Sequence, residues 1–154
     1  MTRAASFVIA IAAMLAAAVP ALAQGLVTNE SKRGSVTATV DALMQALTSR
    51  GVNVVARVNH AESAKAFGLD MPPSEVVIFG NPKLGTPLMQ ANPAIALDLP
   101  LRIAVWQAAD GKVMVAYRAP AAIVASHAIT GKDEIVALMA GALDGLARKA
   151  AGVE

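Results

Sequence analysis

The amino-acid sequence contains no cysteine, and this absence excludes several kinds of chemistry. A chain without cysteine has no disulfide, no thiolate metal site, no CxxC haem attachment and no thiol nucleophile. We therefore expect packing alone to hold the fold together.

Aromatic residues and clustered charges are also scarce. Aromatics make up 3% of the 154 residues, and the formal net charge is +2 at pH 7. The basic residues are scattered singly or in pairs such as Lys32-Arg33, and no basic stripe interleaved with aromatics is present. Because nucleic-acid binding depends on such a stripe, we expect no nucleic-acid partner.

The first 23 residues have the pattern of a cleavable signal peptide. Arg3 supplies the positive start, an apolar run extends from Ala4 to Val19, and Ala21-Leu22-Ala23 has the small-x-small pattern of a cleavage site. A permanent anchor is less favoured, because a bilayer core needs about 20 apolar residues. The sequence thus predicts a signal at 1–23, a single domain at 24–154, a periplasmic or secreted location, and no membrane contact after cleavage.

Two amphipathic helices are predicted. Ser35 is a suitable N-cap, the apolar positions between Val36 and Leu47 have helical spacing, and Gly51 ends this first helix. An apolar stripe from Ile135 to Leu146 predicts a long C-terminal helix over 133–150.

Strands and short helices are predicted between and before these helices. A short β-leaning opening covers 25–30, and β-branched or apolar runs predict strands over 52–58, 75–79, 101–108 and 112–118. The last two form a hairpin with a type I′ turn at Asp110-Gly111. Short helices are expected over 61–68, 87–90 and 121–128. This order favours an α+β fold, with a curved antiparallel sheet and both long helices on one face, over a doubly wound parallel sheet.

No standard catalytic motif is present, so a candidate site has to be assembled from single residues. Polar and turn residues gather in one part of an otherwise apolar chain. The candidate ligand-binding residues are His60, Asn81, Lys83, Thr86, Met89, Asp98 and Tyr117.

The two histidines have different expected positions. His60 lies where a strand gives way to a short helix, where it either contacts a ligand, transfers a proton or binds a metal, or simply caps the helix. His127 is expected near the end of a short helix, where a positive charge suits the helix dipole.

The segment 80–86 is expected to be a loop, and Thr86 at its end is expected to be the N-cap of the next helix. Backbone N–H groups at that helix start, with Lys83 nearby, suit an anion, and a rigid connector is the alternative. Met89 is expected in the core. A His60–Met89 pair would suit copper or haem iron, but two ligands are too few to claim a metal.

Asp98 and Tyr117 each have a structural alternative. Asp98 lies in an apolar stretch, either exposed, capping a turn, or buried beside Lys83, His60 or Arg102. Tyr117 is expected in the core with its hydroxyl at the rim, in preference to acting as a catalytic acid.

One segment resembles a known family. The stretch F-G-N-P-K-x-G-T-x-L-M from Phe79 to Met89, followed by 96–101, Val105-Trp106 and 115–117, resembles the bacterial domain of unknown function family numbered 302. That resemblance covers about 35–127 and implies a β-α-β(4)-α fold, in the architecture of a TATA-binding-protein half-repeat, and a homodimer. It leaves the function open, because the family has no established activity, and the cofactor stays unknown.

Four functions stay open from the sequence. The first is a small-ligand-binding module in which His60, Asn81 and Asp98 orient the ligand and Lys83 supplies charge. The second is an enzyme with His60 as acid/base and Asp98 as its orienting carboxylate. The third is a His60/Met89 metal or haem site, and the fourth is a dimeric interaction protein with no small-molecule site.

Overall fold

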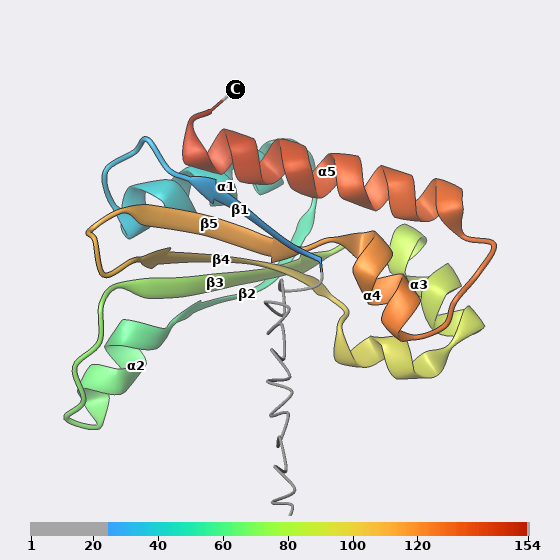
Figure 1. Ribbon diagram of the computed structural model, residues 1–154, viewed down its shortest axis with the longest axis horizontal. Coiled ribbons are helices and arrows are strands. Elements are labelled where there is room, and N and C mark those ends of the chain that lie inside the picture. The colour runs from blue at the N-terminus through green and yellow to red at the C-terminus, as the bar shows by residue number, and fades with distance from the viewer. Residues whose placement is uncertain (1–24, 154) are drawn as a thin grey trace, which may run out of the picture.

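A computed structural model describes residues 25–153, which form a five-stranded antiparallel sheet with helices packed around it (Figure 1). The strand order in the sheet is β1-β5-β4-β3-β2. The strands are β1 (Leu26–Glu30), β2 (Asn53–Asn59), β3 (Ser74–Gly80), β4 (Leu101–Gln107) and β5 (Val113–Arg118). The predicted signal peptide at 1–23 lies outside the described residues.

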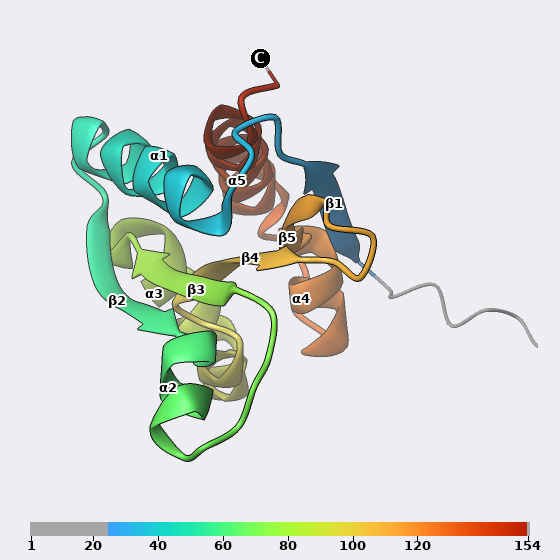
Figure 2. The ribbon, with the colours of Figure 1, turned by 90° about the vertical axis from the view of Figure 1, so that its left-hand side faces the viewer.

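The two long helices cover one face of the sheet, as predicted (Figures 1 and 2). Helix α1 (Val36–Ser49) begins at Ser35, whose side chain accepts the N–H of Ala38, and Gly51 follows it with a φ of +63°. Helix α5 (Asp133–Ala151) ends at Gly152, where Arg33 donates hydrogen bonds to the carbonyls of Lys149 and Ala150. The α+β class and the helix arrangement are therefore confirmed.

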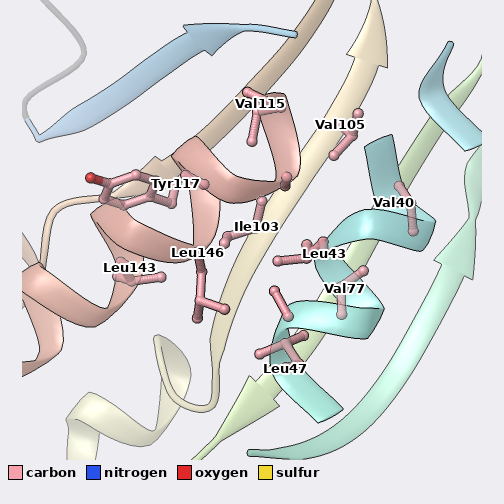
Figure 3. Close-up of a cluster of buried hydrophobic side chains, with 14 of the residues drawn as sticks. Val40, Leu43, Leu47, Val77, Ile103, Val105, Val115, Tyr117, Leu143 and Leu146 are labelled. Atoms are coloured by element: carbon pink, nitrogen blue, oxygen red, sulfur yellow. The ribbon is translucent and has the colours of Figure 1, made fainter. Parts of the chain in front are cut away.

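The main hydrophobic core lies between the sheet and these two helices (Figure 3). Alternate residues of each strand point into it, because side chains along a strand alternate between its two faces. Val77, Ile103 and Val115 are fully buried there, opposite Leu43 and Leu47 of α1. Burying each of these side chains contributes about 1.5–3 kcal/mol before entropic costs, which makes this layer the main source of stability.

Four short helical segments lie at the ends of the sheet. They are α2 (His60–Ala66), α3 (Pro82–Ala91), the 3-10 helix η1 (Pro93–Leu97) and α4 (Pro120–Ser126). A second cluster forms where α3, η1 and α4 meet the first half of α5; it contains Leu88, Ile95, Ile123, Val124, Ile129 and Met139.

The hairpin between β4 and β5 differs from the predicted type I′ turn. Gly111 has a φ of +83°, but Asp110 is not among the residues with positive φ. The N–H of Gly111 donates to the carbonyl of Ala108 at 2.9 Å, and the N–H of Ala108 donates to Lys112 at 2.8 Å. This is a type I turn followed by a left-handed glycine, which adds one residue to the loop.

Helix α3 begins earlier than predicted. Asn81, and not Thr86, is its N-cap, because the Asn81 side chain accepts the N–H of Lys83 and Pro82 occupies the first helical turn. Pro87 lies inside the helix, and residues 82–86 of the segment predicted as a loop are helical.

Candidate functional site

A cavity of about 340 Å³ lies at one end of the sheet, between β2, α3 and α5. Its lining is mostly apolar, with Asn53, Asn81 and Thr86 as the polar side chains. The residues that line it are Val52, Asn53, Val55, Phe79, Gly80, Asn81, Pro82, Leu84, Gly85, Thr86, Met89, Leu99, Pro100, Leu101, Met139, Ala142, Leu143 and Leu146.

Strand register brings the walls of this cavity together. Asn53 at the start of β2 pairs with Gly80 at the end of β3, and Phe79 pairs with Leu101 at the start of β4. A Cβ added to Gly80 would lie 3.2 Å from Cβ of Pro100, so glycine permits the close approach of these two walls.

The first turn of α3 forms the polar corner of the cavity. The N–H groups of Leu84 and Gly85 donate to the carbonyl of Asn81, and the N–H of Lys83 donates to its side chain, each at 3.0 Å. Because Asn81 already takes up these donors, the predicted anion site at this helix start is wrong.

The cavity lies at the boundary between the two hydrophobic clusters. Phe79, Leu143 and Leu146 belong to the main core, and Met139 belongs to the second cluster. Leu101 packs against both. Helix α5 therefore contributes to both clusters and to the cavity wall.

Three of the seven predicted site residues meet at this cavity: Asn81, Thr86 and Met89. Lys83 is exposed on the same helix and is not among the lining residues. The sequence missed the α5 contribution, because the residues that face the cavity share one apolar stripe with those that fill the core.

His60 lies at the opposite end of the sheet from Asn81. It follows Asn59, which pairs with Glu75 at the start of β3, whereas Asn81 follows the end of β3. Strand β2 has seven residues, so at about 3.3 Å per residue its ends are roughly 20 Å apart. His60 is exposed as the first residue of α2. The His60/Met89 site is therefore wrong, because antiparallel pairing separates the two residues.

Asp98 pairs with the other histidine. Its Oδ2 lies 2.8 Å from Nε2 of His127, and Nη1 of Arg118 donates to its Oδ1 at 3.3 Å. Both the Asp98 and the His127 side chains are largely buried, at 19% and 12% exposed. The predicted His60/Asp98 acid/base pair is wrong, since Asp98 precedes β4 at the end of the sheet remote from His60.

A signal for this pairing was present in the sequence. The β4–β5 hairpin was predicted, and a hairpin places the residues before its first strand beside those after its second. Asp98 lies shortly before β4, and His127 caps the end of α4, the helix that directly follows β5. The Asn92 side chain also donates to the His127 carbonyl at 2.9 Å. These hydrogen bonds join η1 to α4, and Asp98 is followed in the chain by Leu99, which lines the cavity.

Tyr117 lies in the main core and not in the cavity lining. Val113, Val115 and Tyr117 share one buried face of β5, as the period-2 pattern predicted. Burial raises the pKa of the Tyr117 hydroxyl, and the charge of Asp144 and a hydrogen bond to it act in the same direction. The expectation that Tyr117 is a core residue is met by this packing.

Metal-ligating side chains do not cluster within the described part of the chain. No group of three or more His, Asp or Glu side chains in residues 25–153 is placed to hold a metal ion. The cavity lining includes the thioether side chains of Met89 and Met139, but no histidine or carboxylate. Its chemistry suits an uncharged apolar molecule with few polar groups.

The sheet order, the two covering helices and the apolar cavity define an α+β protein with an open antiparallel sheet. Residues 27–146 match the family model described as "Domain of unknown function DUF302", and the chain belongs to that family. The crystal structure of an uncharacterized conserved DUF302 protein from Bacillus stearothermophilus superposes with a TM-score of 0.72 at 20% identity, covering 82% of this chain and 98% of the other. The family resemblance is thereby confirmed, and the similar structure supports the fold.

Curated relatives occur in three Brucella species. The chain is 44% identical over 116 residues to proteins named "Fluoride-specific ion channel FluC 1" from Brucella suis and Brucella abortus, and "FluC 2" from Brucella melitensis. The match covers 75% of this chain but only 42–45% of each relative, so the chain spans less than half the length of these proteins.

These relatives overturn the predicted periplasmic or secreted location, because an ion channel is a membrane protein. Within residues 25–153, none of the helices has both the length and the apolar character needed to cross a bilayer.

Proposed function

We propose that this chain is a small-ligand-binding module whose ligand is a largely apolar, uncharged molecule. The observation that carries the proposal is the 340 Å³ cavity, whose volume lies within the range of small-molecule sites. A well-packed domain of this size has few voids larger than a water molecule, so a cavity at the meeting point of two clusters favours binding. Asn53, Asn81 and Thr86 would orient the polar end of the ligand.

The apolar lining narrows the ligand class. An ionised group in such a cavity would lose hydration without gaining a partner of opposite charge, which is costly. Lys83 is exposed on α3 outside the lining, so an anionic end would find its cation only beyond the cavity. The proposal therefore excludes organic ions buried whole and retains neutral molecules with an aromatic or aliphatic body.

The test uses the neutral fluorescent probe N-phenyl-1-naphthylamine and two matched variants of α5. Ala142 is exposed and also lines the cavity, whereas Ala137 is exposed on the same helix and does not line it. We expect Ala142→Phe to fill the cavity and weaken probe binding by at least about tenfold, which corresponds to about 1.4 kcal/mol. Ala137→Phe should bind as the unaltered protein does.

Two results would contradict the proposal. One is the absence of probe fluorescence enhancement with the unaltered protein, and the other is equal binding by the two variants. Thermal unfolding of both variants provides the control for folding. Native mass spectrometry of the purified protein then identifies the mass of any retained ligand.

We propose as a second function that the chain acts together with a fluoride ion channel. The supporting observation is that the matched segment in each Brucella relative is joined to a longer remainder within one protein of that name. Segments joined in one chain are held at high effective concentration, which favours contact between them. A separate chain of the same family would make that contact without the link.

Co-expression tests this second function. The chain is produced with the part of the Brucella suis relative that lies outside the match, and the membranes are extracted in detergent. Co-elution of the two, with a changed rate of fluoride efflux from liposomes, is the expected result. Separate elution with unchanged efflux would exclude the association and leave the ligand-binding proposal standing.

A further inference from the structure

Strand β2 is an edge strand of the sheet, and its outer side carries unpaired backbone groups. It pairs with β3 alone, at the end of the strand order β1-β5-β4-β3-β2. Figure 2 shows β2 along the left-hand margin of the molecule, below α1. Within residues 25–153, no backbone N–H or C=O group of 53–58 has a hydrogen-bond partner on that side. Such an edge is a template on which an extended chain can pair.

The start of this edge borders the cavity. Val52, Asn53 and Val55 line the cavity, and Val55 is 56% exposed although it is apolar. The pairing register with β3 shifts at Val55, which makes it a bulged residue. Bulges bend a strand and are frequent next to functional sites. We call residues 52–55 the cavity edge.

An unpaired cation lies beside the cavity edge. Arg50 is the C-cap of α1, two residues before Val52, and its side chain is exposed. Its guanidinium lies against Gly145 of α5, since a Cβ added to that glycine would be 3.5 Å from Nη1 and Nη2. Leu146, the next residue of α5, lines the cavity. The guanidinium makes no ion pair or side-chain hydrogen bond with the rest of the described chain, so its charge is available to an anion.

We propose that the cavity and its edge bind the C-terminus of an extended peptide whose last side chain is apolar. A peptide that pairs antiparallel with β2, as β3 does on the other side, runs with its C-terminus toward the start of β2. That direction places the last side chain at the cavity and the terminal carboxylate near Arg50. Backbone pairing then supplies affinity, and the cavity selects the side chain.

This inference rests on the proposed function, because an uncharged apolar group has to enter the cavity in both cases. It goes beyond that function in the rest of the ligand. The carboxylate stays outside the apolar lining, where Arg50 offsets its charge, so no ion is buried without a partner. Asn53, the polar lining residue on the cavity edge, has an amide that offers a donor and an acceptor to the last peptide group.

The other edge strand lacks this combination. Strand β1 pairs only with β5, but none of its residues lines the cavity. Glu30 at its end is already paired with Lys32 and Lys112. A peptide on β1 would therefore gain backbone hydrogen bonds without a side-chain pocket.

A small carboxylic acid is the competing occupant of the cavity and Arg50. It shares the apolar body and the carboxylate with a peptide C-terminus, but it leaves the backbone groups of β2 unpaired. The two ligands are therefore distinguished by whether the backbone of the ligand contributes to binding.

The first test addresses the carboxylate. The peptide Gly-Ser-Thr-Val-Thr-Phe is labelled with fluorescein at its N-terminus and made with a free carboxylate or an amide at its C-terminus. We expect amidation and Arg50→Met each to weaken binding at least about tenfold in fluorescence anisotropy, with little further loss when they are combined. Lys83→Met removes an exposed cation of α3 and is the matched control, which should bind as the unaltered protein does. Thermal unfolding of both variants controls for folding.

The second test addresses the backbone, with peptides that are N-methylated at one residue. In antiparallel pairing only alternate residues exchange hydrogen bonds with the neighbouring strand. N-methylation of the valine and of the threonine that follows it should therefore have unequal effects, at least about tenfold at one position and little at the other. Equal effects at the two positions, or displacement of the peptide by 3-phenylpropionate at the peptide's own concentration, would overturn pairing with β2.

The outcome also separates this inference from the proposed function. The peptide should displace N-phenyl-1-naphthylamine, because both occupy the cavity. A peptide that binds without displacing the probe, or that binds equally well as the amide, would overturn the inference. If the unaltered protein binds the probe but not the peptide, the inference fails and the proposed function stands. If it binds neither, both fail.

Discussion

At the scale of single residues, Arg57 on β2 connects three elements through two carboxylates, one of which is buried. It donates to Glu75 on β3 from Nε at 2.6 Å and from Nη2 at 3.2 Å, and to Asp41 on α1 from Nη1 at 2.7 Å. The Glu75 side chain is only 4% exposed, so Arg57 offsets its desolvation. The hydrogen bond to Glu75 is the largest cause that raises the pKa of Arg57 above its ordinary value, although burial acts against it.

Removing Arg57 should therefore cost more than removing its exposed partner. We expect Arg57→Met to lower the free energy of unfolding by about 2–3 kcal/mol, below the range for fully buried pairs because the Arg57 side chain is 33% exposed. Asp41→Asn should cost less than about 1 kcal/mol, since the Asp41 side chain is 55% exposed. Urea unfolding at pH 7 measures both free energies. Equal losses would contradict the argument that buried Glu75 depends on Arg57 for its partner.

Tyr117 provides a titration that no other residue obscures, because it is the single tyrosine of the chain. Burial first, and Asp144 second, raises its pKa above the ordinary value of 10.0. The folded pKa exceeds the unfolded pKa, so the neutral hydroxyl contributes stability below pH 10 that is lost as the pH rises further. Absorbance at 295 nm should show a midpoint above 10 in the folded protein.

The Asp144→Asn variant is the control for the two causes. It removes the nearby charge and leaves Tyr117 buried, so the midpoint should fall only part of the way toward 10.0. Tyr117→Phe should lose stability less steeply than the unaltered protein above pH 10. A midpoint at the ordinary value in the folded protein would show that the hydroxyl is solvated.

At the scale of elements, the local sequence pattern was sufficient to predict most helices and strands. Helices α1 and α5 were predicted from their apolar spacing, and β2 to β5 from β-branched or apolar runs, because each element carries its own signal. The start of α3 was missed because Asn81-Pro82 and Thr86-Pro87 both resemble a cap followed by the first helical residue. The structure decides between them, because the Asn81 side chain accepts the N–H of Lys83, whereas Thr86 and Pro87 lie inside the helix.

The cavity likewise contains residues that the local sequence predicted and residues whose role depends on tertiary packing. Asn81, Thr86 and Met89 were predicted because they stand out from the surrounding apolar sequence. His60 also stands out, but its distance from the cavity follows from the antiparallel pairing of β2 with β3 and not from its residue type. Leu99 and Ala142 have no local signal that distinguishes a cavity wall from solid core. Their role depends on how α5 lies over the end of the sheet.

The cap of α3 is testable on both stability and binding. Asn81→Ala removes the side-chain oxygen that accepts the Lys83 N–H at 3.0 Å, and we expect a loss of about 1 kcal/mol. Asn81→Asp keeps an accepting oxygen and should retain most of that stability. Because α3 forms a wall of the cavity, Asn81→Ala should also weaken binding of N-phenyl-1-naphthylamine more than Asn81→Asp does.

Thermal unfolding and probe titration of the three proteins measure these effects. Weakened binding without loss of stability would mean that the Asn81 amide contacts the probe directly. Loss of stability shared equally by the alanine and aspartate variants would mean that the cap hydrogen bond is not the stabilising contact.

At the scale of the whole molecule, the two hydrophobic clusters define parts of unequal stability. The main core is covered by α1 and α5 and contains the buried residues of β3, β4 and β5. The second cluster is smaller and is built on short helices. Every residue of α2 is at least partly exposed, so α2 draws little stability from burial. The free energy of local unfolding should therefore be highest in the main core, lower in the second cluster and lowest in α2.

Hydrogen exchange measured by mass spectrometry tests this order and the cavity together. We expect the slowest amide exchange in β4 and β5, intermediate exchange in α3 and η1, and the fastest in α2. A ligand that binds the folded form stabilises it by about 2.7 kcal/mol at 100 times its Kd. Because α3 forms a wall of the cavity and α2 lies at the far end of β2, saturating N-phenyl-1-naphthylamine should slow exchange in α3 strongly and in α2 little. Equal slowing in α2 and α3 would instead show that the probe does not act through the cavity.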